Sequence, residues 1–326
     1  YNEAEYAKEV AEFLGTDHTD LYIDEARMFD LVSSIPVYYD EPFADSSQIA
    51  TMLVSELARK RVTVALSGDG GDEFFCGYNV YDKVHQAQQL DWLGEMAHGI
   101  CNIPGVCSLK LEEKLPFSVR AIAGNRPKET KTQFAYNKYE PIARRMVQGE
   151  QLSCFYPVES SYDVKNWQIR RMLLDMDTYL PGDILCKVDR ASMKYSLEAR
   201  CPILDKEVME YSFRIPHEMK YQQGIKKKIL KDIAYDYLPK ELLERPKTGF
   251  AVPMDQWLHG PLKEQLLSYS DNTFLKKQGI FDPEYTSMRV AQYLGTRDAG
   301  PSTGANYSKL MWAFFVFQQW FETYRR

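Results

Sequence analysis

The chain has 326 residues, of which 44% are hydrophobic and 26% charged, a composition typical of a globular protein with an ample core. Its 46 acidic and 40 basic residues give a net charge of −6, which disfavours nucleic acid as the main partner. The six cysteines form no C-x-x-C pair and there are only five histidines, so zinc and disulfide frameworks have little support. No signal-peptide pattern is present and the longest apolar run, 310–317, is too short to span a bilayer, so we expect a cytoplasmic protein.

The first part of the chain is expected to alternate helices and strands. Residues 3–14 have helical spacing, 19–24 predict a short strand, and 25–35 predict a second helix that ends before a proline. A loop follows, then a helix to about residue 61, and the β-branched run 61–68 predicts a strand. This order is typical of parallel α/β proteins, in which ligands bind at the carboxyl ends of strands.

Helical periodicity dominates the rest of the chain, and no convincing strand is predicted beyond residue 80. Short turns such as LPGD (180–183) are expected to separate the helices. We therefore predict an α/β fold class, with a partial parallel-sheet nucleotide-binding part at 1–80 and a mainly helical part of the same domain at 81–326. The helices are expected at about 80–98, 117–123, 131–149, 164–178, 184–197, 206–213, 224–237, 254–270, 283–294 and 305–324.

The segment LSGDGGDEFFCGY (66–78) follows the last predicted strand directly. It lacks the third glycine of G-x-G-x-x-G and the G-K-[ST] of a P-loop. One interpretation is a glycine turn whose acids begin a helix. The other is a phosphate site: Ser67 and Gly68 offer a hydroxyl and backbone N–H groups, while Asp69, Asp72 and Glu73 hold Mg²⁺ or act as a base. A metal between acids and phosphate would remove their repulsion.

The glycine-rich segment resembles the S-G-E-G-x-D-E-x-x-x-G-Y signature of the asparagine synthetase family. Three further stretches resemble that family in the same order. They are YNEAEYAKEVAEFLGTDH near the start, DILCKVDRASMKYSLEARCPILD in the middle, and LPKELLERPKTGFAVP after it. The tail LMWAFFVFQQWF also fits, so the resemblance covers essentially the whole chain.

The resemblance implies an adenine nucleotide α-hydrolase-like fold and ATP-dependent chemistry with Mg²⁺. A carboxylate, usually the side chain of aspartate, becomes an acyl-adenylate with release of pyrophosphate, and ammonia then attacks the acyl carbon. In full-length members a separate N-terminal domain cuts glutamine to supply the ammonia. The partners expected are therefore a small carboxylate and ammonia, with neither nucleic acid nor a membrane, and the chain could form a homodimer.

Carried onto this sequence, the resemblance gives roles to five residues of the glycine-rich segment. Ser67 and Gly68 would contact the nucleotide phosphates. Asp69 stands where most members have glutamate, at a position tied to adenylate formation, and its carboxylate has a shorter reach. Asp72 would be the ligand of Mg²⁺ and pyrophosphate. Glu73 would lie in the substrate site, with a helix-end acid as the alternative interpretation.

Three residues outside this segment complete the expected site. Lys247, in RPKTGF, would be an electrostatic clamp on the developing oxyanion and pyrophosphate, or else a surface lysine on a loop. Arg200 would bind a carboxylate, although a salt-bridge network explains it almost as well. Ser47, next to Ser46, would line the substrate pocket, or these serines would cap a helix. Four further residues have no assigned role and could either shape the substrate site or form a salt-bridge network: Lys187, Asp189, Arg190 and Glu198.

The family also has an S-G-G-x-D-S loop that binds the pyrophosphate of ATP. The only near match in this sequence is SGDGGD, which belongs to the later motif at 66–78. The glutaminase domain with its cysteine nucleophile is not found either. We therefore expect the chain to be a fragment of a complete synthetase and to be inactive alone, because one half of the nucleotide site and the central strands of the sheet would lie upstream.

Three functions remain open from the sequence. The first is the synthetase half of a glutamine-hydrolysing asparagine synthetase. The second is a ligase of the same chemistry that acts on another carboxylate, such as a sugar acid, a β-lactam precursor or a peptide, because Asp69 departs from the family pattern. The third is a non-catalytic remnant that serves as an interaction module.

Overall fold

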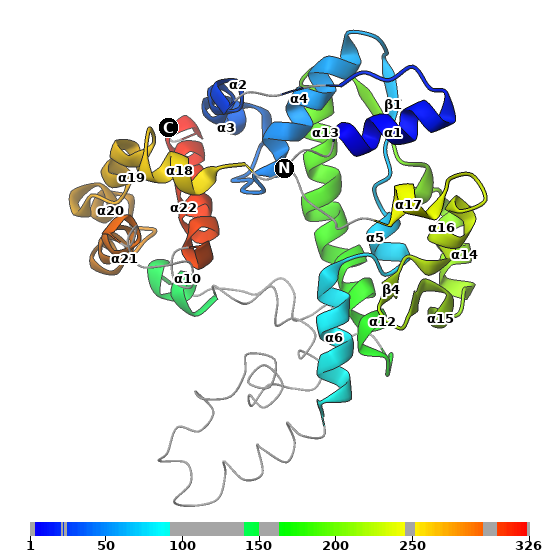
Figure 1. Ribbon diagram of the computed structural model, residues 1–326. Helices are drawn as coiled ribbons and strands as arrows, with labels where there is room; N and C mark the ends of the chain where they lie inside the picture. Colours follow the sequence, from blue (N-terminus) through cyan, green and yellow to red (C-terminus); the bar gives the residue numbers. More distant parts are fainter. Residues whose placement is uncertain are drawn as a thin grey trace, which may run out of the picture.

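A computed structural model describes residues 4–20, 22, 25–91, 140–149, 163–244, 252–295 and 305–324 (Figure 1). The described part is mostly helical and contains two sheets of two short strands each. This agrees with the α/β class in a coarse sense. Among the described helices, none combines the length and the apolar character that crossing a lipid bilayer requires.

The amino-terminal elements follow the expected order only in part. They are α1 (Ala4–Leu14), α2 (Glu25–Asp30), η1 (Val32–Ser34), α3 (Ile35–Tyr38), α4 (Ser47–Arg59), β1 (Val64–Leu66), α5 (Gly71–Phe74) and α6 (Asn79–Gln89). Pro36 does not stop the helical run, because it lies in the first turn of α3, where its missing N–H costs nothing. The described residues of the expected strand at 19–24, which are Thr19, Asp20 and Tyr22, form no strand.

The parallel sheet pairs β1 with a strand that the sequence did not reveal. The middle elements are α10 (Glu140–Met146), α12 (Trp167–Leu174), η5 (Asp175–Leu185), α13 (Cys186–Met193), β2 (Glu198–Arg200), η6 (Pro202–Leu204), α14 (Lys206–Arg214), α15 (His217–Lys220), β3 (Tyr221–Gln222), β4 (Ile225–Lys226), α16 (Lys228–Ala234) and α17 (Lys240–Leu243). In register, Val64 lies opposite Glu198 and Leu66 opposite Arg200. The pairing joins segments on both sides of residue 80, and the domain boundary predicted there stays a prediction.

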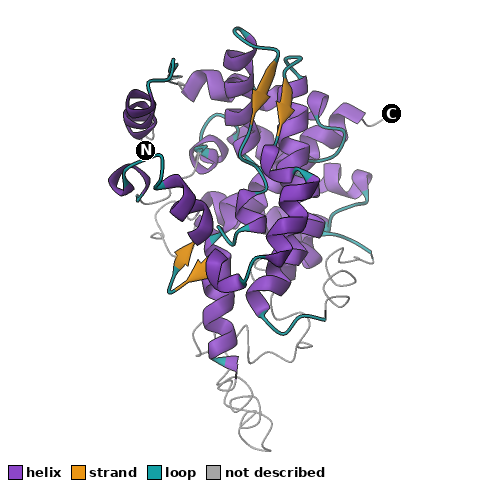
Figure 2. Cartoon of the chain, turned by 90° about the vertical axis from the view of Figure 1, so that its right-hand side faces the viewer, coloured by secondary structure: helices purple, strands orange, loops and turns teal. Residues whose placement is uncertain are grey.

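The expectation of no strand beyond residue 80 is wrong for β2 and for the hairpin of β3 and β4. Strands of two or three residues are too short to show a period of two. Gln223 and Gly224 connect the two strands and both have positive φ, 50° and 86°, as a two-residue type I′ turn requires. In the sequence, the glycine at 224 was the one usable signal of this turn. Figure 2 shows the two small sheets at separate places among the helices.

The helix that follows Asn166 is longer than predicted. Asn166 caps it by accepting hydrogen bonds from the backbone N–H groups of Gln168 and Ile169. It runs through α12, η5 and α13 without a break, so the turn expected at LPGD is wrong. Pro181 lies inside η5, a π-helical stretch. Proline has no N–H to donate, and the wider π turn accommodates its ring without ending the helix.

The carboxyl-terminal helices form an aromatic core on one side of the molecule (Figure 1). They are α18 (Met254–His259), α19 (Lys263–Tyr269), α20 (Asn272–Gln278), α21 (Pro283–Gly295) and α22 (Ala305–Tyr324). Trp312 of α22 stacks on Phe315 at 5.9 Å between ring centroids, and Trp257 of α18 lies 6.3 Å from Trp312. The same core continues to α4 through Ile49. α4 packs against α13, and together they separate this core from the parallel sheet.

Candidate active site

The glycine turn lies at the carboxyl ends of both parallel strands. The Ser67 backbone N–H donates to the Arg200 carbonyl at 2.8 Å, which extends the β1–β2 ladder by one bond. The Ser67 hydroxyl then donates to Asp69 Oδ2 at 2.5 Å. The structure therefore brings Ser67 and Asp69 together, at the edge of the sheet where parallel α/β proteins bind ligands.

Two glycines of the turn are explained by close packing. Gly70 has φ of +89°, and a Cβ added there would lie 2.4 Å from Leu204 Cδ2. A Cβ on Gly71 would lie 3.3 Å from Ile203 Cδ1. Both neighbours belong to η6, which follows β2, so Gly70 in particular lets η6 pack onto the turn.

Gly68 differs from these two glycines, because no atom of the described ranges lies within 4 Å of where its Cβ would be. Within the described residues, nothing accepts a hydrogen bond from the backbone N–H of Gly68 or of Asp69. A glycine with open space beside it and two unpaired amides fits the close approach of an anionic group such as a phosphate.

Asp72 is held by a lysine that sequence reasoning did not single out. Lys227 precedes α16, adopts a left-handed conformation with φ of 53°, and places Nζ 3.1 Å from Asp72 Oδ2. A Cβ on Gly77 would lie 2.0 Å from Asp72 Oδ1 and 2.2 Å from Lys227 Cε, so the pair occupies the space that this glycine leaves. The only sequence signal was the run of three lysines at 226–228, which reads as a solvated surface.

Glu73 is a buried acid with one strong partner. Its exposed fraction is 1%, and the Tyr78 hydroxyl donates to Glu73 Oε1 at 2.6 Å. Burial raises the pKa of Glu73, while the hydrogen bond from Tyr78 opposes that rise. Glu73 lies in the first turn of the short helix α5, the position that the alternative interpretation of a helix-end acid gives it, and its role in the substrate site stays a prediction.

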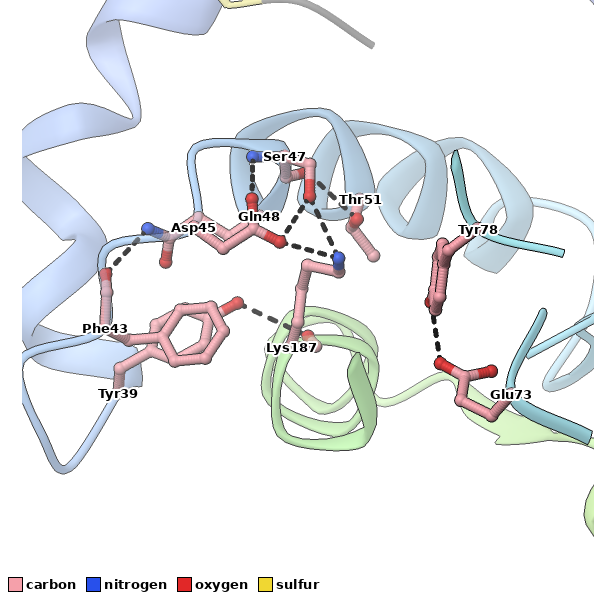
Figure 3. A network of polar contacts seen from close by, with 9 residues as sticks. All are labelled: Tyr39, Phe43, Asp45, Ser47, Gln48, Thr51, Glu73, Tyr78 and Lys187. Carbon is pink, nitrogen blue, oxygen red and sulfur yellow. Dashed lines mark hydrogen bonds and ion pairs between the residues drawn. The ribbon is translucent and has the colours of Figure 1, made fainter. Parts of the chain in front are cut away.

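Ser47 belongs to a second polar cluster, formed by Asp45, Ser47 and Lys187 (Figure 3). Lys187 Nζ lies 2.8 Å from Asp45 Oδ2 and 2.9 Å from Ser47 Oγ, and the Ser47 hydroxyl donates to Asp45 Oδ2 at 2.8 Å. Burial would raise the pKa of Asp45, but Lys187 and the hydrogen bonds from Ser47 lower it below its usual value. Asp45 Oδ1 accepts from the Ser47 N–H at 3.0 Å, so Asp45 caps α4, and Ser46 makes no side-chain capping bond.

Tyr179 and Asp183 of η5 lie near two polar clusters, the Glu73–Tyr78 pair and the cluster of Asp45, Ser47 and Lys187. The Tyr179 ring lies edge-on to Tyr78, with 5.7 Å between centroids and 78° between planes. Burial is the main cause that raises the pKa of Asp183 to about 6, followed by the nearby charge of Asp45, while Lys187 opposes the rise. Asp183 was expected to lie in a surface turn at LPGD, and the uninterrupted helix brings it to the site instead.

The Arg200 side chain forms a local ion pair outside these clusters. The Arg200 side chain is 63% exposed, and its Nε donates to Glu198 Oε1 at 2.7 Å, the local ion pair of the alternative interpretation. Arg190 likewise pairs with Asp40. The carboxylate-binding role of Arg200 stays a prediction. Lys247 lies outside the described residues.

The described residues do not form an all-protein metal cage. No group of three or more His, Cys, Asp or Glu side chains in the described ranges is arranged to hold a metal ion. Asp69 bonds Ser67 and Asp72 pairs with Lys227, so neither pairs with the other. Mg²⁺ commonly uses only one or two carboxylates together with substrate phosphates, and a single carboxylate beside the open turn fits that pattern.

Comparison with known proteins connects this geometry to a reaction class. The family model described as asparagine synthase matches residues 1–322. The chain is 28% identical over 330 residues to asparagine synthetase [glutamine-hydrolyzing] 1 of Bacillus subtilis, covering 98% of this chain and 50% of that protein. It is 28% identical to a putative asparagine synthetase of Mycobacterium bovis, covering 98% and 48%, and 21% identical to the amidase chry2 of Gibberella zeae, covering 87% and 46%. The chain therefore spans about half the length of these curated relatives.

Proposed function

Because the chain belongs to the asparagine synthase family, we propose that it carries out ATP-dependent amide formation, in which a substrate carboxylate is adenylated and then attacked by ammonia. The finer proposal is that aspartate is converted to asparagine, with ammonia released from glutamine elsewhere in the whole protein. The observation that carries the proposal is the open turn at Gly68, at the carboxyl ends of the parallel strands and close in sequence to the buried acid Glu73.

ATP fits the turn through groups that the chain already presents. The backbone amides of Gly68 and Asp69 and the Ser67 hydroxyl would bind phosphate oxygens, and bound ATP supplies the adenylyl group. Lys227 Nζ lies 3.7 Å from where a Cβ of Gly71 would be, so its ammonium is close to the first turn of α5. Its positive charge would favour the pyrophosphate there. Lys247 is proposed to add a second positive charge.

The acids of the turn would have separate tasks. The single hydrogen of the Ser67 hydroxyl would turn from Asp69 to a phosphate oxygen, and Asp69 would stabilise the geometry in which the substrate carboxylate meets the phosphates. Asp72 would take part in binding Mg²⁺ only if Lys227 moved to the phosphates and left its carboxylate. Glu73, oriented by Tyr78, would face the substrate side of the site.

Exchange of labelled pyrophosphate into ATP tests this proposal, because it reports adenylation without the ammonia step. We expect the full gene product to catalyse exchange that depends on aspartate, and the 326-residue chain by itself to be inactive. No carboxylate-dependent exchange by the full gene product would refute the ligase function. Robust exchange by the isolated chain would refute only the requirement for more sequence.

A second candidate is the same chemistry on another carboxylate. Two observations favour it: Asp69 is shorter than the glutamate usual at that position, and one relative carries the name amidase. The exchange assay separates the two candidates when aspartate is compared with sugar acids, β-amino acids and peptides. Exchange with one of these at a higher kcat/KM than with aspartate would assign the second function.

A further inference from the structure

Lys187 is a mostly buried cation that uses two of its hydrogen-bond donors within the part of the chain that the structure describes. It extends from the first turn of α13 towards the first turn of α4, and its side chain is 12% exposed. A lysine ammonium has three N–H donors. Two of them reach Asp45 and Ser47, and no acceptor for the third is found in the part of the chain that the structure describes.

The side chain of Lys187 ends on the side where Tyr78 and Glu73 lie (Figure 3). Tyr179 connects the two clusters. Its ring contacts Tyr78, and the negative charges of nearby Asp183, Asp45 and Glu73 help to raise the pKa of its hydroxyl. The surroundings of Tyr179 therefore include the carboxylates of Asp183, Asp45 and Glu73, and Lys187 lies beside two of these, Asp45 and Asp183.

The charges of this region suit a ligand that carries both signs. Asp45 neutralises Lys187 and keeps the ammonium in place, which makes its burial tolerable. Asp183 and Glu73 have no such cation in direct contact among the described residues, and burial disfavours their ionised forms. A ligand ammonium near these two acids would give them a charged partner, and a ligand carboxylate at Lys187 would accept from its third N–H.

We propose that Lys187 is the specificity-determining residue of the site and that its third N–H binds the second, non-reacting carboxylate of an amino-acid substrate such as aspartate. The inference rests on the proposed function. Asp45 and Ser47 act as positioning residues that aim the ammonium. The carboxylate to be adenylated would then point away from Lys187, towards the turn that contains Gly68.

Aspartate and β-alanine provide a direct test in the pyrophosphate exchange assay with the full gene product. β-Alanine keeps the reacting carboxylate and the ammonium of aspartate and lacks only the second carboxylate. In Lys187→Met we expect kcat/KM for aspartate to fall by on the order of 100-fold, because an interaction with the substrate's own charge is lost. The value for β-alanine should stay within about threefold of the unmodified protein, since no such interaction exists for it.

The alternative is that Lys187 only ties α13 to α4. In that case kcat/KM would fall by the same factor for aspartate and for β-alanine, and the proposal would be wrong. Lys194→Met is the matched control. Lys194 lies at the end of the same helix and donates to Ser34 Oγ at 3.1 Å, so this substitution removes a comparable hydrogen bond between α13 and another segment, away from the site. The ratio of the two substrates should not change in this control.

Two further outcomes are decisive. If Lys187→Met does not fold, Lys187→Gln keeps a donor for Asp45 and Ser47, and it should still lose the preference for aspartate; a retained preference overturns the proposal. If the unmodified protein shows exchange with neither aspartate nor β-alanine but does so with another carboxylate, aspartate as the substrate is refuted and this inference falls with it. No exchange with any carboxylate refutes the ligase function itself.

Discussion

The glycine turn and the carboxyl-terminal helical core are built on opposite principles. At the turn, Glu73 is buried although it is charged. In the helical core, Trp312 and Phe315 are buried against other rings, as apolar side chains are expected to be. The turn region therefore accepts energetic costs that the helical core does not, and costs of this kind concentrate where proteins bind and react.

From this contrast we expect the helical core to determine mainly the stability of the fold and the glycine turn to determine mainly the activity. Aromatic burial in α18–α22 should supply much of the free energy of folding. The turn region should contribute less, because buried charges cost free energy even when they are paired. Substitutions in the two regions should therefore give opposite results in assays of unfolding and of adenylation.

The largest effect on stability is expected for Phe315→Ala. Removing a fully buried ring leaves a cavity in the core and should lower the free energy of unfolding by about 3–5 kcal/mol. Chemical denaturation measures the loss, and pyrophosphate exchange well below the melting temperature should remain near normal per folded molecule. A large fall in exchange by fully folded protein would contradict the division between the two regions.

Asp69→Asn is the converse experiment at the turn. The amide keeps nearly the same shape but lacks the charge, so exchange by the full gene product should fall roughly 100-fold while the melting temperature changes little. Asp271→Asn is the matched control, because Asp271 caps α20 and asparagine caps helices equally well. A normal exchange rate in Asp69→Asn would leave Asp69 as a turn residue only.

Two glycines sharpen the comparison within the turn region itself. Gly77→Ala would drive a Cβ into the Asp72–Lys227 pair and should cost about 1–3 kcal/mol of stability together with activity. Gly68→Ala meets no atom of the described residues, so it should leave the unfolding transition unchanged and reduce only exchange. Loss of stability in Gly68→Ala would mean that this glycine serves the fold and not a ligand.

The smallest expected effect is a dependence of stability on pH at Asp183. Its folded pKa, about 6, lies above the usual value of 3.8, so its favourable contribution is complete below the usual pKa and is lost as the pH rises through 6. Asp183→Asn should match the unmodified protein at pH 4 and exceed its stability by about 1–2 kcal/mol at pH 8, after allowance for solvent screening. Denaturation curves at the two pH values measure the difference. Equal stability at pH 8 would show that Asp183 is well solvated.

Sequence reasoning located the turn correctly because its evidence is local. A β-branched strand followed by a glycine-rich, acidic segment predicts a ligand-binding turn from neighbouring residues alone, and the structure places Ser67 and Asp69 at the end of β1 as expected. The family assignment is confirmed by the match over residues 1–322. The specific roles of Asp69, Asp72 and Glu73 stay predictions.

The features that escaped prediction depend on contacts between distant segments. Lys227 looked like one of three surface lysines until the hairpin of β3 and β4 carried it to Asp72. Asp183 looked like part of a turn because Pro181 and Gly182 normally end helices, and the π-helical geometry of η5 is not visible in a sequence pattern. Lys187 was named as a candidate from the sequence, but its ion pair with Asp45 becomes evident only when α4 packs against α13.

The hydrogen bond from Ser67 to Arg200 has a consequence for the order of folding. It closes a very long loop of chain, and parallel strands that pair across such a loop form slowly, because chain entropy must be lost before the contacts are gained. The helices contain mostly local contacts and should form earlier. We therefore expect refolding protein to regain helical circular dichroism before the Ser67 backbone N–H becomes protected from hydrogen exchange, with a lag set by the arrival of β2 beside β1.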